Sequence, residues 1–156
     1  MRSRGFTLIE MLVVLAILGI LAAAARPLLE LSVRRMHETE LRAALRTLRG
    51  GIDAYKRAAD AGNVASPADG NGYPANLQLL VAGVSDLRSP NGRKIYFLRS
   101  LPRDPMVADT SVPAAETWAL RASDSPPDDP KPGRDVFDVH SKAGGKALDG
   151  SLYTQW

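Results

Sequence analysis

The chain has 156 residues, of which 45% are hydrophobic and 24% charged, so it has room for one small globular domain and one further helical segment. Its 20 basic and 17 acidic residues give a net charge of +3, an excess too weak and too local to indicate nucleic-acid binding. The absence of cysteine excludes disulfides and thiolate zinc sites.

An apolar segment follows a short basic leader. From Phe6 to Ala25 it has about the twenty residues that one helix needs to cross a membrane. Arg2 and Arg4 precede it and predict that this end stays in the cytoplasm, because basic residues flank the cytoplasmic side of a membrane helix. An ordinary secretory signal cleaved within Ala22 to Ala25 is the alternative, but such cleavage would discard the one unusual charge in the chain.

That unusual charge is Glu10, a carboxylate inside the apolar segment. Near the middle of a membrane helix it would cost on the order of 3 kcal/mol, which makes it a functional hypothesis. The residues three and four positions away are Phe6, Thr7, Val13 and Val14. None is charged, so we expect a partner from a chain end or another molecule. The alternative is an ordinary signal anchor with Glu10 solvated at the headgroup level.

The run Arg4-Gly5-Phe6-Thr7-Leu8-Ile9-Glu10, the aliphatic stretch behind it and Pro27 resemble the class III leader and first helix of type IV pilins and type II secretion pseudopilins. This resemblance implies cleavage after Gly5 by a prepilin peptidase, N-methylation of Phe6, and polymerisation into a filament. In such a filament the Phe6 amine of one subunit would neutralise Glu10 of a neighbour.

The helical pattern continues from Pro27, which we expect either to kink the helix or to begin a second one. Beyond it an apolar stripe recurs at steps of four and three: Leu41, Leu45, Leu48, Ile52, Tyr55 and Ala59. The residues largely off this stripe predict a solvated polar face: Arg42, Arg46, Arg49, Asp53, Lys56 and Arg57. Gly50-Gly51 interrupts the helix, through close approach of another element or as a local weak point. The helix should end near Ala61-Gly62.

The remaining residues predict a short helix and a small sheet. A turn and a helix with inward leucines are expected over 73–81, and strands over 94–98, 117–122 and 135–141. In the last strand Val136, Asp138 and His140 share one face. An antiparallel sheet packed on the helix stripe gives an α+β fold, as in pilins.

Two segments of this part are similar to major pseudopilins of type II secretion: Leu101-Pro102-Arg103-Asp104-Pro105, and 135–141 with the sequence Asp-Val-Phe-Asp-Val-His-Ser. In that family a C-terminal loop holds calcium through aspartates and carbonyls, which makes Asp138, Ser141 and Asp149 the calcium candidates here. The acidic residue expected soon after Ser141 is replaced by Ala143-Gly144-Gly145. The alternative is a glycine-rich loop pinned by packing of Trp156.

The resemblance divides the chain into four parts. They are a cleaved leader (1–5), a transmembrane and assembly helix (6–26), its amphipathic continuation (27–62), and a periplasmic globular part with the C-terminal loop (63–156). The chain would be a single-pass protein of the bacterial inner membrane. Its implied partners are copies of itself, other pseudopilins, prepilin peptidase, and an inner-membrane platform with a cytoplasmic ATPase.

The predicted function is that of a structural subunit of a type II secretion pseudopilus, which helps to drive protein export across the outer membrane. One alternative is a type IV pilin for adhesion, motility or DNA uptake, which the lack of C-terminal cysteines disfavours. Another is a membrane-anchored periplasmic binding module that never polymerises. No catalytic motif occurs, and His37 and His140 lie in different elements outside any metal-ligand spacing, so we do not expect an enzyme.

Overall fold

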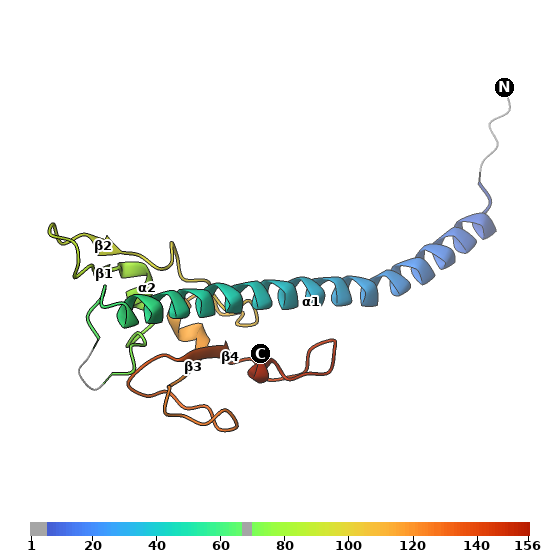
Figure 1. The fold of residues 1–156 in the computed structure, drawn as a ribbon. Helices are drawn as coiled ribbons and strands as arrows, with labels where there is room; N and C mark the ends of the chain where they lie inside the picture. Colours follow the sequence, from blue (N-terminus) through green and yellow to red (C-terminus); the bar gives the residue numbers. More distant parts are fainter. Residues whose placement is uncertain (1–5, 67–69) are drawn as a thin grey trace. The chain divides into compact units, whose positions relative to one another are not determined.

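The structure, a computed structural model, describes residues 6–66 and 70–156 (Figure 1). Its helices are α1 (Leu8–Asp60) and α2 (Gln78–Ala82), with short 3-10 helices η1 (Ala114–Thr117) and η2 (Tyr153–Gln155). Its strands are β1 (Val84–Ser85), β2 (Lys94–Ile95), β3 (Trp118–Arg121) and β4 (Asp138–Ser141). The chain divides into two compact units, Met1–Met36 and His37–Trp156, and α1 contributes to both. The α+β fold class is confirmed.

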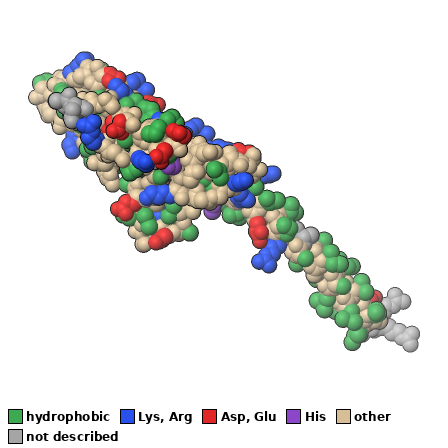
Figure 2. Space-filling view, turned by 90° about the horizontal axis from the view of Figure 1, so that it is seen from below, with side chains coloured by type: hydrophobic (Ala, Val, Ile, Leu, Met, Phe, Trp, Pro, Cys, Tyr) green, Lys and Arg blue, Asp and Glu red, His purple; other side chains and the backbone are tan. Residues whose placement is uncertain are grey.

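The first unit is helical, and its apolar side chains are exposed. Leu8 is 78% exposed and Ile20 is 70% exposed, and none of the most apolar window of α1 is buried. By length and composition this stretch could cross a membrane. Figure 2 shows hydrophobic side chains gathered along it. The helix runs through Pro27 without ending, so the predicted start of a second helix there was wrong.

The second unit builds its core on the predicted stripe of α1. Leu41, Leu48 and Ile52 are fully buried, and Leu45 and Tyr55 are nearly so. The residues that pack with them from the rest of the unit include Val64, Leu77, Leu80, Trp118, Val136, Val139 and Tyr153. The inward leucines predicted near α2 are therefore confirmed at Leu77 and Leu80.

Backbone conformation explains where α1 ends, and packing explains one of its two adjacent glycines. Gly62 takes a left-handed φ of 69°, its N–H donates to the carbonyl of Ala59, and the N–H of Asn63 donates to the carbonyl of Ala58. This is the Schellman pattern that satisfies the last carbonyls of a helix.

A Cβ on Gly51 would lie 2.9 Å from Cγ of Leu98, whereas one on Gly50 would meet nothing. Close approach therefore accounts for Gly51 alone.

The strands form two separate two-stranded antiparallel sheets instead of one. Trp118 pairs with Ser141 and Arg121 with Asp138, as predicted for the two longer strands. The strand predicted over 94–98 is shorter, because the N–H groups of Phe97 and Leu98 donate to the carbonyl of Leu80. Strand β1, its partner, was not predicted, since two residues are too few to show a periodicity.

Candidate functional site

The start of α1 is closed by a reciprocal cap between Thr7 and Glu10. The N–H and the hydroxyl of Thr7 each donate to Oε2 of Glu10 at 2.8 Å, and the N–H of Glu10 donates to the Thr7 hydroxyl at 3.3 Å. This is a capping box, in which the first residue of a helix and the acid three residues later satisfy each other's N–H groups. The prediction that Glu10 has no partner within helical reach was therefore wrong for hydrogen bonds.

The cap holds the Glu10 carboxylate against Thr7 at the start of α1. An N–H group at a helix start costs several kcal/mol if it is left unsatisfied in hydrocarbon, and Glu10 satisfies that of Thr7. In the described part of the chain no cation is paired with Glu10, so its negative charge is still uncompensated.

Phe6, the predicted partner in a neighbouring copy, has a side chain 79% exposed. Gly5, the predicted cleavage position, lies outside the described residues.

At the other end of the chain, Glu38 of α1 holds residues 142–156, which we call the C-terminal segment. The Glu38 side chain is 4% exposed. Its Oε1 accepts a hydrogen bond from the Leu148 N–H and another from the Tyr153 hydroxyl, both at 2.9 Å. A buried carboxylate is tolerated only when donors surround it, so Glu38 fixes the middle of the C-terminal segment against the helix.

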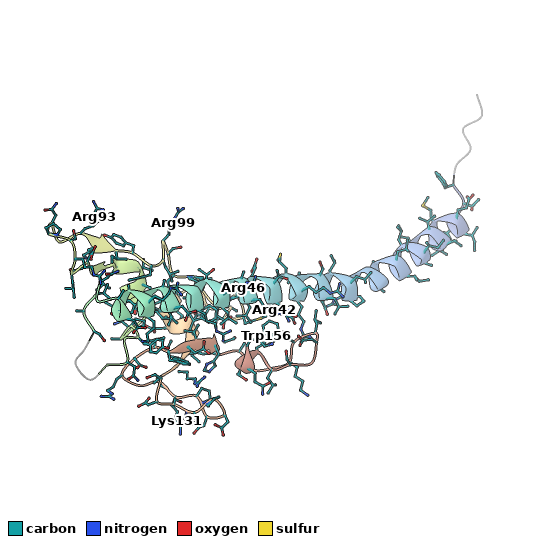
Figure 3. All side chains as sticks on the ribbon, viewed as in Figure 1. Arg42, Arg46, Arg93, Arg99, Lys131 and Trp156 are labelled. Carbon is teal, nitrogen blue, oxygen red and sulfur yellow. The ribbon has the colours of Figure 1, made fainter. Side chains whose placement is uncertain are left out.

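Arg42 lies one helical turn further on and contacts two parts of the same segment. Its Nη2 donates to Oδ2 of Asp149 at 3.0 Å, and its guanidinium carbon lies 4.0 Å from the centre of the Trp156 ring (Figure 3). The Trp156 indole N–H donates to the Ser151 hydroxyl at 2.6 Å, and its ring packs edge-on against Tyr153. The predicted pinning of this loop by Trp156 is confirmed.

Arg49 joins β4 to the last residue of the chain. Its Nε donates to Oδ1 of Asp138 at 2.7 Å, and its Nη2 donates to the main-chain oxygens of Val139 and Trp156 at 3.1 and 2.9 Å. The side chains of Arg42 and Arg49 stay 46% and 40% exposed, as predicted for a solvated face, but the prediction did not include their bonds to distant residues. The sequence reasoning missed these bonds because the partners are 89 to 107 residues away, beyond any local pattern.

A second buried carboxylate, Asp104, lies in the Leu-Pro-x-Asp-Pro turn. It is 1% exposed and accepts a hydrogen bond from the Ser141 hydroxyl at 2.6 Å and one from the Met106 N–H at 2.8 Å. The Trp118 indole N–H donates to the Pro102 carbonyl in the same turn. These partners fasten the turn to the sheet of β3 and β4.

The structure does not gather the three calcium candidates into one group. Asp138 is bonded to Arg49, Asp149 to Arg42 and Ser151, and Ser141 to Asp104. Asp138 and Ser141 also face opposite sides of β4, because their positions differ by an odd number, three, along a strand. Over residues 6–66 and 70–156, no group of three His, Cys, Asp or Glu side chains is placed to hold a metal ion.

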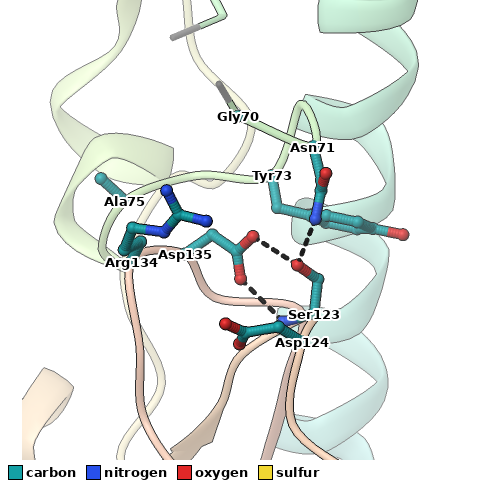
Figure 4. Close-up of a pocket in the computed structure, with 8 residues that line it drawn as sticks. All are labelled: Gly70, Asn71, Tyr73, Ala75, Ser123, Asp124, Arg134 and Asp135. Atoms are coloured by element: carbon teal, nitrogen blue, oxygen red, sulfur yellow. Dashed lines mark hydrogen bonds between the residues drawn. The ribbon is translucent and has the colours of Figure 1, made fainter. Parts of the chain in front are cut away.

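A small polar pocket of about 70 Å³ lies on another side of the second unit (Figure 4). There the amide of Asn71 donates to the Ser123 hydroxyl at 2.6 Å, and that hydroxyl donates to Asp135 at 2.6 Å. The Ser123 N–H also donates to Asp135 at 2.8 Å. These bonds join the loop after α1 to the two chain segments that flank the proline-rich connection.

Comparison with known proteins gives a consistent result. Residues 1–25 match the family described as the prokaryotic N-terminal methylation motif. Over 112 residues, or 69% of this chain, the sequence is 33% identical to the type II secretion system core protein G of Klebsiella pneumoniae, of which the match covers 72%. The proteins of the same name from Dickeya chrysanthemi and Pectobacterium carotovorum are each 31% identical, with 66% and 65% of their lengths covered. No solved structure gives a significant match.

Proposed function

Because the chain belongs to the type II secretion system core protein G family, the major pseudopilins, we propose that it polymerises through the first half of α1 as a structural subunit of a secretion pseudopilus. Its role is mechanical, since growth of such a filament pushes substrates toward an outer-membrane channel. The relatives' shared name and the methylation motif support this assignment.

The observation that carries the proposal is the combination of an uncovered apolar helix with one capped acid at its start. Side chains such as Leu15, 64% exposed, and Leu18, 55% exposed, are surrounded by lipid before assembly and by neighbouring helices afterwards. A helix that only anchored a domain would need the apolar surface but not the carboxylate, which insertion into lipid disfavours.

We assign Glu10 the role of register selection between subunits. Cleavage after Gly5 would leave a cationic amine at Phe6, and this amine is the group that Glu10 of a neighbouring subunit pairs with. In a low-dielectric filament core an unpaired carboxylate costs much more than a paired one. The pairing therefore favours the one axial offset at which each amine meets a carboxylate.

The partners follow from this assembly. Prepilin peptidase removes the leader, other pseudopilins join the filament, and an inner-membrane platform with a cytoplasmic ATPase supplies the energy that the subunit lacks. Before assembly the subunit is a single-pass protein of the inner membrane, with its second unit in the periplasm. Arg2 and Arg4 favour this orientation.

The intact mass of the membrane-extracted chain, from cells with and without prepilin peptidase, tests the proposal. We expect a mature chain beginning at N-methylated Phe6 only when the peptidase is present. A chain that begins at Met1 in both strains, or one cut within Ala22 to Ala25, would contradict the proposal.

A further inference from the structure

We propose that this pseudopilin closes its C-terminal segment without calcium, through a lock in which Glu38, Arg42 and Arg49 of α1 hold that segment directly. Major pseudopilins resemble this chain closely enough to imply a calcium ion in the corresponding loop. The residues present here do not fit that ion, and they supply another means of closure. The lock is a property of the single subunit, so it does not depend on polymerisation.

The donor set is the first argument. Calcium takes six to eight oxygen ligands at about 2.3–2.6 Å. The carboxylates of Asp138 and Asp149 are instead within 2.7 and 3.0 Å of guanidinium nitrogens of Arg49 and Arg42. The Ser141 hydroxyl is buried and donates to Asp104, on the opposite side of β4 from Asp138. Each of the three candidates therefore has its hydrogen-bonding atoms engaged by a different protein group.

The charge of the site is the second argument. The charged side chains of the C-terminal segment are Lys142, Lys146 and Asp149, two cations and one anion. From α1, Glu38 adds one negative charge, and Arg42 and Arg49 add two positive charges beside the carboxylates that a cation would need. A divalent cation entering here would have to displace both guanidinium groups, because like charges at these distances repel.

The geometry of the lock is the third argument. Positions 38, 42 and 49 are separated by four and seven residues, so their side chains lie along one face of α1. Glu38 holds the middle of the segment through Leu148 and Tyr153, while Arg42 and Arg49 hold its end at Trp156. The contacts to Leu148, Asp149, Tyr153 and Trp156 hold the second half of the segment, and those of Arg49 to Asp138 and Val139 tie the same face of α1 to β4.

Limited trypsin digestion of the full chain in detergent micelles, in millimolar calcium or in excess EGTA, tests the proposal. The main chain of Lys146 pairs with Leu152, so cleavage after Lys146 reports opening of the segment. We expect equal cleavage rates in calcium and in EGTA for the wild-type chain. We expect rates several-fold higher, in both conditions, for Arg42→Ala and for Arg49→Ala.

Arg46→Ala is the matched control. Arg46 lines the same groove as Arg42, Arg49 and Trp156, of about 370 Å³, but has no hydrogen bond or ion pair within the described chain. Its variant should be cut at the wild-type rate. Cleavage after Arg57, in the helical part of the second unit, reports global unfolding and should stay unchanged in every variant.

Three results would overturn the proposal. One is faster cleavage of the wild-type chain in EGTA that calcium reverses. Another is wild-type cleavage rates in both Arg42→Ala and Arg49→Ala. The third is an equal rise after Lys146 and Arg57, because the arginines would then hold the whole unit instead of the segment. Single subunits in micelles are digested, so none of these results depends on whether the chain forms filaments.

Discussion

The hydroxyl of Ser141 donates a hydrogen bond to Oδ2 of Asp104 at 2.6 Å, across 37 residues of sequence and in a site closed to solvent. Asp104 begins the turn at Pro105 and Met106, where the Val107 N–H donates to its carbonyl at 3.2 Å, and Ser141 ends β4, so this bond joins the turn to the sheet. The Thr117 hydroxyl completes the site by accepting a hydrogen bond from the Asp104 N–H at 3.1 Å. These buried hydrogen bonds therefore position the Leu-Pro-x-Asp-Pro segment against the sheet.

We predict that Ser141→Ala destabilises the chain by about 1–3 kcal/mol, because it leaves a buried carboxylate oxygen without its donor. For a unit of this size, 1 kcal/mol corresponds to a shift in the melting temperature of about 4 °C. Thermal melting of the detergent-solubilised chain measures the shift. Ser111→Ala is the matched control, since the Ser111 hydroxyl also bonds an aspartate, Asp109, but at an exposed site. A melting temperature as high as that of the control would contradict the prediction.

For assembly, we predict that Glu10→Ala abolishes filament formation while the subunit still inserts in the membrane. Insertion should even become easier, because the substitution removes a carboxylate from an apolar segment. The measurement is the yield of sheared or cross-linked filaments against the amount of membrane-inserted subunit. Glu10→Gln separates the two roles of this residue, since an amide can still accept from Thr7 but has no charge for the Phe6 amine.

The control for that experiment is Glu30→Ala. Glu30 is an exposed acid on the same helix, and it pairs with Arg26 at 3.5 Å within one turn. An exposed pair of this kind contributes little to stability. Filament yield should stay at the wild-type value in this variant. Normal filaments from Glu10→Ala would refute a role of Glu10 in assembly and would favour a membrane anchor that does not polymerise.

The stability of the second unit should fall between neutral and mildly acidic pH because of His140. Burial lowers the pKa of this imidazole below its usual 6.5, the nearby Asp138 opposes the shift, and Arg49 adds to it. A lowered pKa means that the unfolded chain binds the proton first, so stability is complete above pH 6.5 and is lost as the pH falls toward the folded pKa. Melting temperatures between about pH 7.5 and 5.5 should show this loss.

His140→Gln should remove most of that pH dependence, and His37→Gln should retain it. The second variant is the matched control, because it removes the other imidazole in the chain and leaves the His140 site intact. Below this range Asp149 also contributes to acid sensitivity. Its two hydrogen bonds from Ser151 lower its pKa below 3.8, so its contribution to stability is lost only as the pH falls through that lower value. An unchanged pH profile in His140→Gln would contradict the assignment.

The sequence predicted what depends on local pattern, and it missed what depends on distant partners. The stripe from Leu41 to Ala59 has a helical period and could be recognised, as could the left-handed end of α1 at Gly62. Arg42 and Arg49 have no such signal, because a charged residue off the stripe looks the same whether water or a distant aspartate is its partner. The Thr7–Glu10 cap did have a local signal, a threonine three residues before a glutamate, and could have been predicted.

The paired glycines of α1 give a prediction in which neighbouring substitutions have opposite signs. Alanine has a higher helix propensity than glycine by about 0.5–1 kcal/mol, so Gly50→Ala, at an exposed position with open space around it, should raise stability by about that amount. At Gly51 a steric clash opposes the gain in helix propensity. The added Cβ would lie 2.9, 3.0 and 3.2 Å from side-chain carbons of Leu98. Overpacking of this kind costs about 1–3 kcal/mol, so Gly51→Ala should lower stability.

The clash at Gly51 can be relieved from the other side of the contact. Leu98→Ala makes room for a Cβ at position 51, and the double variant should therefore be more stable than the sum of the two single changes predicts. A coupling free energy of about 0.5 kcal/mol or more in this double-mutant cycle, measured by urea unfolding in detergent, is the expected result. Additive effects, or a Gly51→Ala chain as stable as Gly50→Ala, would mean that Leu98 moves aside without cost and that both glycines are only weak points in the helix.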